Sequence, residues 1–378
     1  MTSNSGASRE RGAVSILMAV MIVGLVGVAA FAIDIGYGLV VKSELQNIAD
    51  TSTLAGTREL AIVYRDMQTT AGTDSYWGKH YLTSSERAQI ESKINTYSQA
   101  NKAGSVSISI ASGDVTYGKY NDSTKEIEPT DPLYTGVMGL KVTARRDANS
   151  NSVVDTFLAR VLGINSMSIT AESGAALSAL RKAPQGKLGI PVGISEFWFK
   201  AKNSPCGHHD TGSGADNHGI RLYPTGPQTG ETITNAQGCA GWHTYTDYPA
   251  SASKLKNVLD DQKTGSYISP ETEANVTSYN FTGGVIATAF TKMMQLFNAM
   301  KDTDGTWTTV VPVYEASDCS NPNGAIKIVG FATAWIYEVH SGSEKWIDAT
   351  VDCNVIDWGE GGNDYDYGTL VGRPGMTQ

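Results

Sequence analysis

The feature that most constrains this chain is an apolar run from Ala13 to Ile33 that contains no charged side chain. At 1.5 Å per residue, a helix of this length spans about 30 Å, which matches the hydrocarbon core of a bilayer. A helix also satisfies its own backbone hydrogen bonds, as lipid requires. Soluble helices seldom run this long without a polar face, so the sequence predicts a transmembrane helix over residues 13–33 rather than a buried core helix.

The charges that flank this run predict its direction. Arg9 and Arg11 precede it, whereas Asp34 and then Lys42 follow it. Because basic residues stay on the cytoplasmic side, residues 1–12 are expected in the cytoplasm and everything after Asp34 beyond the membrane. In a bacterium this describes a single-pass inner-membrane protein with its bulk in the periplasm. The run exceeds the 7–15 apolar residues usual in a cleaved signal, so an uncleaved N-terminus is expected.

Composition narrows the classes of function. Charged residues make up only 18% of the 378 positions and the net charge is -9, with no basic run longer than Arg145-Arg146. Nucleic acid is therefore not an expected partner, because phosphate binding needs clustered Lys and Arg. A Gly-x-Ser-x-Gly elbow and a phosphate-binding Gly-rich loop are both missing from the sequence. We expect neither an enzyme nor a bound cofactor, and no small-molecule substrate is identified.

The residues beyond the membrane predict an α+β fold in two parts. Residues 34–180 are expected to form a membrane-proximal domain, in which the anchor continues as a helix packed on a small, mostly antiparallel sheet. A second helix should begin at Thr83, because Thr83-x-x-Glu86 is a capping-box pattern. Residues 181–187 are expected to be a hinge, 188–353 a β-rich distal domain and 354–378 a Gly- and Asp-rich tail, extended or mobile.

Alternating and apolar patterns locate the remaining elements. The expected strands are Val106–Ile110, Asp114–Tyr120, Val137–Arg145, Ser166–Leu177, Ile190–Lys200, Trp307–Tyr314, Ala325–Val339 and Lys345–Cys353, and the expected helices are Ser152–Leu162, Ser253–Leu259 and Val285–Met300.

Four cysteines, Cys206, Cys239, Cys319 and Cys353, all fall in the distal part. An even number in an exported segment indicates disulfides, because that compartment is oxidising. Three pairings are possible, and we favour Cys206–Cys239 with Cys319–Cys353, since each pair flanks one long irregular segment. A zinc site is the weaker alternative, because no two cysteines have the close spacing usual for zinc.

Three further segments have residue types suited to ligand binding. The loop with His208, His209, Asp210 and His218 has metal-ligating side chains, but a solvated loop is the preferred interpretation. Asp302-Thr303-Asp304-Gly305 starts like a calcium loop, yet Val313 stands where the twelfth-position Glu is needed. A helix end followed by a turn is the preferred interpretation, and an unrelated calcium site near Asp304 is the weaker alternative. Gly241-Trp242-His243 could belong to a platform for sugar or protein, although such aromatics more often fill a β core.

The N-terminal segment contains a series of short motifs: Arg11-Gly12-Ala13-Val14, Asp34-Ile35-Gly36, Leu45-Gln46-Asn47, Ala49-Asp50 and Leu54-Ala55-Gly56, with a weaker echo at Phe157–Gly163. With these motifs around its apolar run, the segment resembles the TadE/TadG-like Flp pilus-assembly proteins, and TadG-like members most closely. The Asp-x-Ser-x-Ser motif of a von Willebrand A domain, present in many TadG-like proteins, is missing. Prepilin-like relatives have a Glu five residues after a cleavable Gly, whereas Leu17 stands five after Gly12.

The resemblance implies a structural or assembly role in a Tad/Flp-type pilus system, with the membrane and other pilus-assembly proteins as partners and a link to cell adhesion. Gly24 and Gly27 offer a weak close-approach face for packing against neighbouring helices. Two alternatives remain open: a membrane-tethered cell-envelope binding protein for sugar or protein, and a pilin-like filament subunit.

Overall fold

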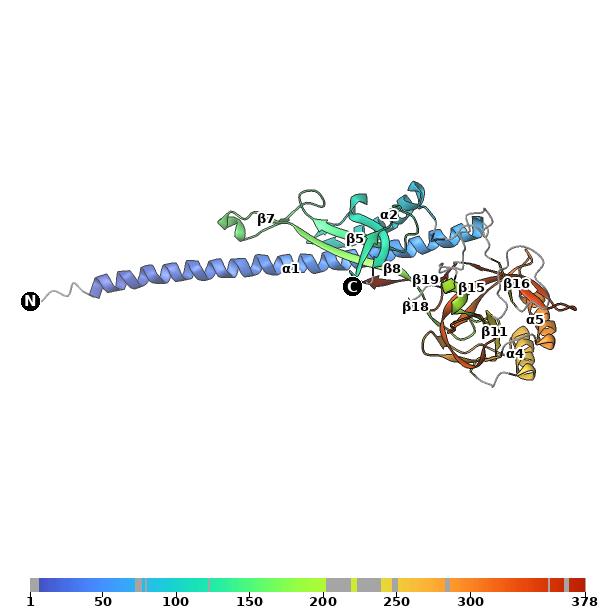
Figure 1. Cartoon of the computed structure of the whole chain (residues 1–378). Helices are drawn as coiled ribbons and strands as arrows, with labels where there is room; N and C mark the ends of the chain where they lie inside the picture. Colours follow the sequence, from blue (N-terminus) through green and yellow to red (C-terminus); the bar gives the residue numbers. More distant parts are fainter. Residues whose placement is uncertain are drawn as a thin grey trace, which may run out of the picture.

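The computed structural model describes residues 7–71, 77–78, 80–121, 123–201, 219–222, 239–246, 251–282, 286–352, 354–363 and 367–377. Its shape is that of a long rod with two folded parts at one end (Figure 1). The rod is helix α1, Ala7–Ala71, which continues from the apolar run into the folded region without a break. Gly36 and Gly38 both lie within this continuous helix.

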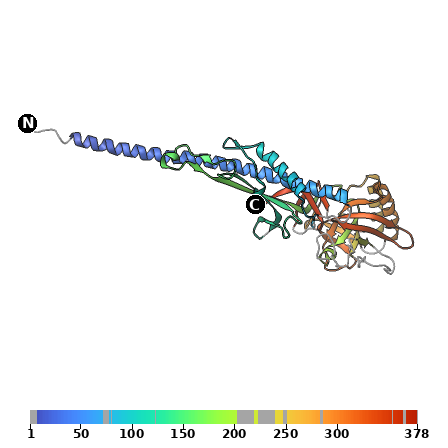
Figure 2. The ribbon, with the colours of Figure 1, turned by 90° about the horizontal axis from the view of Figure 1, so that it is seen from above.

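The membrane-proximal part is an α+β layer, as the sequence predicts. The C-terminal half of α1 lies across a sheet whose central strands are β5 (Gly139–Arg146) and β8 (Ile169–Ala183). Helix α2 (Ser84–Gln99) packs beside α1 (Figure 2). It starts with the expected capping box, in which Thr83 and Glu86 each satisfy a backbone N–H of the other.

The strand order in this sheet is β17-β19-β8-β5-β3-β4, with β12 and β18 pairing to β8 outside this path. All these pairings are antiparallel except β17 with β19. The other strands of this sheet are β3 Val115–Asn121, β4 Glu126–Pro129, β12 Thr272–Glu273, β17 Asn354–Ile356, β18 Glu360–Asn363 and β19 Thr369–Thr377. Two short hairpins lie outside the sheet: β1 (Lys102–Ala103) pairs with β2 (Val106–Ser107), and β6 (Val154–Asp155) pairs with β7 (Ser166–Met167).

The distal part is built around a sheet that closes on itself, because its last strand also pairs with one of its inner strands. Their order is β10-β16-β15-β13-β11-β9-β14, and β14 also pairs with β15. Since β15 (Asn323–His340) is long, β13 borders its first half and β14 and β16 border its second half. The other bounds are β9 Val192–Ser195, β10 Gly219–Leu222, β11 Ala240–His243, β13 Ser278–Thr282, β14 Trp307–Tyr314 and β16 Trp346–Asp352.

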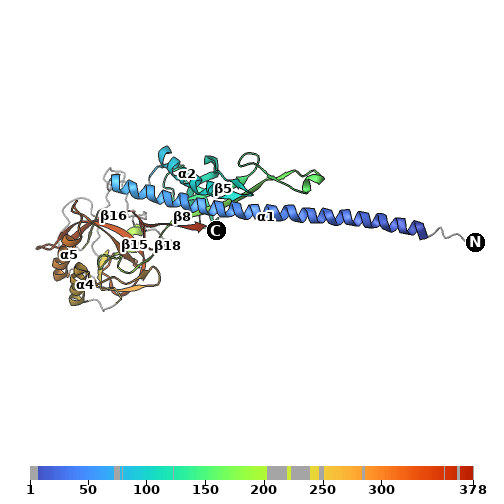
Figure 3. The ribbon, with the colours of Figure 1, turned by 180° about the vertical axis from the view of Figure 1, so that it is seen from behind.

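Two helices close one side of this distal sheet, α4 (Ala252–Thr264) and α5 (Ala287–Met300) (Figure 3). They pack against each other, and α5 also contacts β15. Both segments were expected to be helical, and their buried residues join those of the strands in one apolar core.

Three local predictions are wrong. Of the strand expected over residues 106–110, only Val106–Ser107 is a strand, β2, which pairs with β1. Residues 190–200 do not form one strand: β9 ends at Ser195 and the short helix α3 (Glu196–Ala201) follows. The Ser195 hydroxyl accepts a hydrogen bond from the Phe197 N–H, which starts the turn, and Lys200 pairs with Glu196 one turn away. Residues 152–162 are not one helix either, because they divide between β6 and the 3₁₀ helix η2 (Ala159–Leu162).

The expected tail is part of the sheets rather than extended or mobile. It holds β17, β18 and β19, and β19 runs antiparallel to β8 in the membrane-proximal sheet. The segment expected to be a hinge overlaps the end of β8, where Lys182 and Ala183 pair with β12. The two parts also share an apolar cluster, in which Leu180 and Val371 pack with residues of the distal strands.

Candidate functional site

The first half of α1 has its apolar side chains exposed. Val14 is 58% exposed, Val23 73% and Val40 54%, although a soluble helix of this composition would bury such residues. Within the described residues, α1 is the helix that is long and apolar enough to span a membrane. This exposure rules out the alternative of a buried core helix, because the run packs against almost nothing in the chain.

The second half of the same helix is fastened to β8. Val41 and Leu45 are fully buried against the sheet. The hydroxyl groups of Thr53 and Thr57 donate hydrogen bonds to the carbonyls of Ser173 and Ala175, at 3.2 and 3.3 Å. One continuous helix therefore forms both the exposed apolar rod and the helix that packs on the sheet of the proximal domain, with no linker between them.

Asp34 lies where the exposed rod meets the folded part. Its carboxylate accepts hydrogen bonds from the backbone N–H groups of Phe157, Leu158 and Ala159, at 2.7, 3.0 and 2.5 Å. The residue is only 3% exposed. An acidic side chain on the free N–H groups at the start of a helix is favourable, because it satisfies donors that have no partner within the helix. Asp34 thus holds η2 against α1.

In the sequence, Asp34 ends the apolar run and belongs to the Asp34-Ile35-Gly36 motif, and neither feature predicts this contact. The Phe157–Gly163 motif, which echoes the same resemblance, is the one signal that points to the second segment. No pattern near either segment predicts the contact, because Asp34 and Phe157 lie more than a hundred residues apart in the sequence.

Other predicted residues of the anchor lie on α1 in the structure. Arg9 and Arg11 fall in its first turns, in a stretch whose side chains are not described. A Cβ atom placed on Gly24 or Gly27 would meet nothing within 4 Å, so this face is open. Membrane orientation and helix packing at these positions stay predictions.

The predicted disulfide pairing is wrong at the two cysteines that the structure describes. Cys239 bonds to Cys319, across a sequence separation of 80 residues, and not to Cys206. Cys206 and Cys353 lie outside the described residues. The choice of neighbouring cysteines failed because the closed sheet brings the start of β11 beside the loop between β14 and β15.

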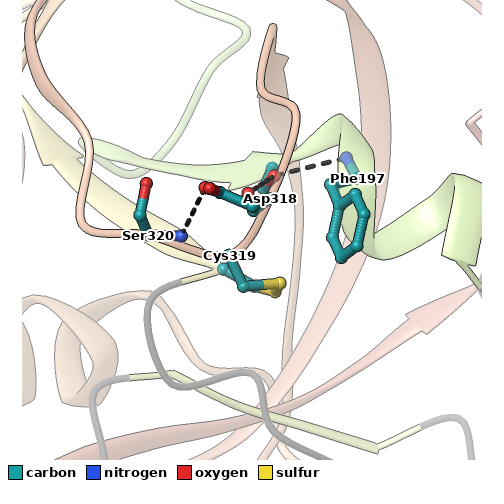
Figure 4. The surroundings of a disulfide bond; sticks show 6 residues. Phe197, Asp318, Cys319 and Ser320 are labelled. Atoms are coloured by element: carbon teal, nitrogen blue, oxygen red, sulfur yellow. Dashed lines mark hydrogen bonds between the residues drawn. A yellow bond between two sulfur atoms is a disulfide. The ribbon is translucent and has the colours of Figure 1, made fainter.

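Residues next to this disulfide form hydrogen bonds that hold its surroundings in place (Figure 4). Next to Cys319, the Asp318 carboxylate accepts the N–H of Ser320 at 2.9 Å. Hydrogen bonds from the side chain and the N–H of Ser320 lower the pKa of Asp318. The Asp318 carbonyl accepts the hydroxyl of Ser195 at 3.2 Å. The bond and these contacts connect β11, the loop after β14 and the start of α3.

The candidate metal ligands give no cluster in the described part of the chain. The loop with His208, His209, Asp210 and His218 lies outside the described residues. The Asp304 carboxylate accepts both the N–H and the hydroxyl of Thr306, at 2.9 Å each, and these hydrogen bonds lower its pKa. This geometry is the turn that the sequence favoured over a calcium site.

The aromatic residues around β11 fill the core and do not form a surface platform. Trp242 and His243 are fully buried. The His243 ring lies 4.6 Å from the ring centre of Tyr245, 4.8 Å from that of Tyr279 and 5.4 Å from that of Phe281. Burial lowers the pKa of His243 to about 3, so the imidazole is neutral.

Comparison with known proteins finds one family model that matches the N-terminal segment. Residues 12–59 match a family model described as "Putative Flp pilus-assembly TadE/G-like". The match lies wholly within α1, from the exposed rod to the turns packed on β8. No curated protein and no solved structure matches the chain.

Proposed function

We propose that this chain, whose residues 12–59 match the TadE/G-like Flp pilus-assembly family, is a membrane-anchored periplasmic component of a Tad/Flp-type pilus system. The observation that carries the proposal is the coincidence of the family match with an exposed apolar helix long enough to span a bilayer. The role is structural, and other pilus-assembly proteins are the partners.

The anchor also supports a mechanism without chemistry. Because α1 crosses from the apolar rod into the domain without a break, a shift or rotation of the rod reaches the sheet directly. The disulfide-bonded distal module is carried at the far end of this helix. In the inner membrane, with residues 1–12 in the cytoplasm, the module would stand away from the bilayer and face envelope partners.

A membrane and topology experiment tests this proposal. The full-length protein should stay with inner-membrane vesicles after alkaline carbonate and leave only with detergent. A protease added to spheroplasts should degrade the distal module while an N-terminal epitope tag survives. Extraction by carbonate alone, or loss of the N-terminal tag with the distal module protected, would refute the anchor or its direction.

The protruding apolar rod also suits a pilin-like filament subunit, in which such helices pack together. The two roles differ at the N-terminus, because a processed subunit would start at Ala13. Mass spectrometry of membranes and of sheared surface filaments separates them. An intact N-terminus in membranes supports the retained anchor, and a mature form starting at Ala13 in filaments supports the subunit.

A further inference from the structure

The hairpin of β6 and β7 exposes large apolar side chains at its tip. Phe157 is 73% exposed, Val161 83% and Ile164 46%. Three such residues within one short turn are unusual for a surface in water, and a cluster of this kind marks a contact with a partner or a membrane. A turn that lies only in water does not need apolar side chains, because polar residues can form the same turn.

The position of this tip is fixed relative to the anchor. Asp34 holds the backbone of Phe157, Leu158 and Ala159, so the tip lies at the level of Asp34 on α1. Ala30, one turn nearer the N-terminus, is also covered, with 7% exposed. Figures 1 and 2 both show the hairpin running along α1 towards its N-terminal end.

The exposed apolar surface of α1 continues past this level. It includes Ile35, 56% exposed, and Leu39, 66% exposed, and it ends near Val40. From Val14 to Val40 a helix rises about 40 Å, which matches a bilayer including its headgroup regions. Asp34 and the tip therefore fall roughly 9 Å inside one end of this surface, at the depth where the headgroups meet the acyl chains.

The composition of the tip suits that depth. Its apolar side chains lie beside Arg160, an exposed residue whose Nε donates to the Thr156 carbonyl at 2.9 Å. An arginine can keep its guanidinium among lipid phosphates while neighbouring apolar groups enter the acyl region. The Arg160 charge also interacts with the Asp34 carboxylate, so the apolar side chains and not a net positive charge suit the tip to this depth.

We propose that the tip Phe157–Ile164 inserts into the interfacial layer of the same membrane that α1 spans. This inference rests on the proposed membrane anchor and adds a second point of attachment. A single helix leaves the domain free to rotate about the membrane normal and to tilt. Two attachments, held together by Asp34 as a positioning residue, restrict the tilt of the periplasmic part.

Site-specific photocrosslinking to lipid tests the proposal on the full-length protein. Benzoylphenylalanine is placed singly at Ile22 in the rod, at Phe157 or Val161 in the tip, and at Val276, which is 70% exposed in the distal part. Each protein is reconstituted in vesicles of phosphatidylethanolamine and phosphatidylglycerol and irradiated. We expect lipid adducts by mass at positions 22, 157 and 161, at least tenfold above position 276.

The controls separate this inference from the anchor itself. Adducts at position 22 with only the position 276 background at 157 and 161 would overturn the insertion of the tip and leave the anchor standing. Absence of adducts at position 22 would overturn the anchor and, with it, this inference.

A second variant tests Asp34. Asp34→Ala should lower the adduct yield at position 157 several-fold with no change at position 22, because the tip loses the acceptor that holds it. Asp155→Ala, which removes an exposed carboxylate from the same hairpin, is the matched control and should change neither yield. An Asp34→Ala yield equal to that of Asp155→Ala would overturn the positioning role.

Discussion

The buried imidazole of His243 should make the distal module sensitive to mild acid. Its ring is enclosed by Tyr245, Tyr279 and Phe281, and Nδ1 accepts a long hydrogen bond of 3.4 Å from the Tyr245 N–H. Burial lowers the pKa of this imidazole, and a hydrogen bond to the Val192 backbone opposes that shift only in part. The pKa in the folded protein is about 3, against 6.5 for an ordinary histidine. Protonation therefore favours the unfolded chain, in which the imidazole is solvated.

The sign and size of the effect follow from proton linkage. The stability from a neutral His243 is fully present above pH 6.5 and is lost as the pH falls towards 3. In that window the free energy of unfolding should drop by about 1.4 kcal/mol per pH unit. Between pH 7.5 and 4.5 the contribution of this one residue is about 2.7 kcal/mol.

Urea unfolding of the full-length protein in detergent, followed by tryptophan fluorescence, measures how the free energy of unfolding changes with pH. His243→Phe keeps an aromatic ring in the cluster but cannot take a proton. The drop between pH 7.5 and 4.5 should be about 2.7 kcal/mol larger for the native protein than for the variant, because carboxylates and other histidines cancel in the difference. Equal drops in the two proteins would refute the assignment of a buried neutral imidazole.

Three further predictions concern stability. Replacing Cys239 and Cys319 together by Ser should cost about 4.5 kcal/mol in the chain-entropy model for a separation of 80 residues; peptide mapping without reduction should recover the Cys239–Cys319 link, and its absence would contradict the structure. Gly330→Ala should cost about 1–3 kcal/mol in urea unfolding, because its Cβ would lie 2.2 Å from the Tyr367 ring, and a neutral result would reject that packing. Thr83→Ala should cost about 1 kcal/mol and Thr83→Ser far less, measured by thermal melting; equal losses would exclude the capping role.

Sequence patterns predicted the elements whose stability is local. The start of α2 follows from Thr83 and Glu86 alone, and the apolar run predicts the first half of α1 because a single segment in lipid can satisfy its own backbone only as a helix. The strand Trp307–Tyr314 was placed at its observed bounds, since its β-branched and aromatic residues suit a half-buried pleated surface.

The features that the sequence could not give depend on contacts between distant segments. The aromatic residues Phe197–Phe199 read as a strand, but a helix of this length shows no periodicity and depends on contacts such as that of Glu196 with the Ala316 N–H. The Gly-rich residues 369–377 have a weak strand pattern and become ordered because β8 offers them an edge. The disulfide partner of Cys239 follows from sheet closure, which composition and spacing do not encode.

The return of β19 to the sheet beside α1 has a consequence for the order of folding. Strand β8 emerges early in synthesis, yet its neighbour begins at Thr369, nearly two hundred residues later. Until Thr369–Thr377 has been made, the edge of β8 that pairs with β19 has no partner from this strand; in the proposed topology, that edge would stay open near the membrane until the C-terminal segment has been exported. The sheet beside α1 therefore completes its pairing only with the last segment of the chain, and if the proposed export were arrested, the unpaired edge would be available to chaperones and proteases.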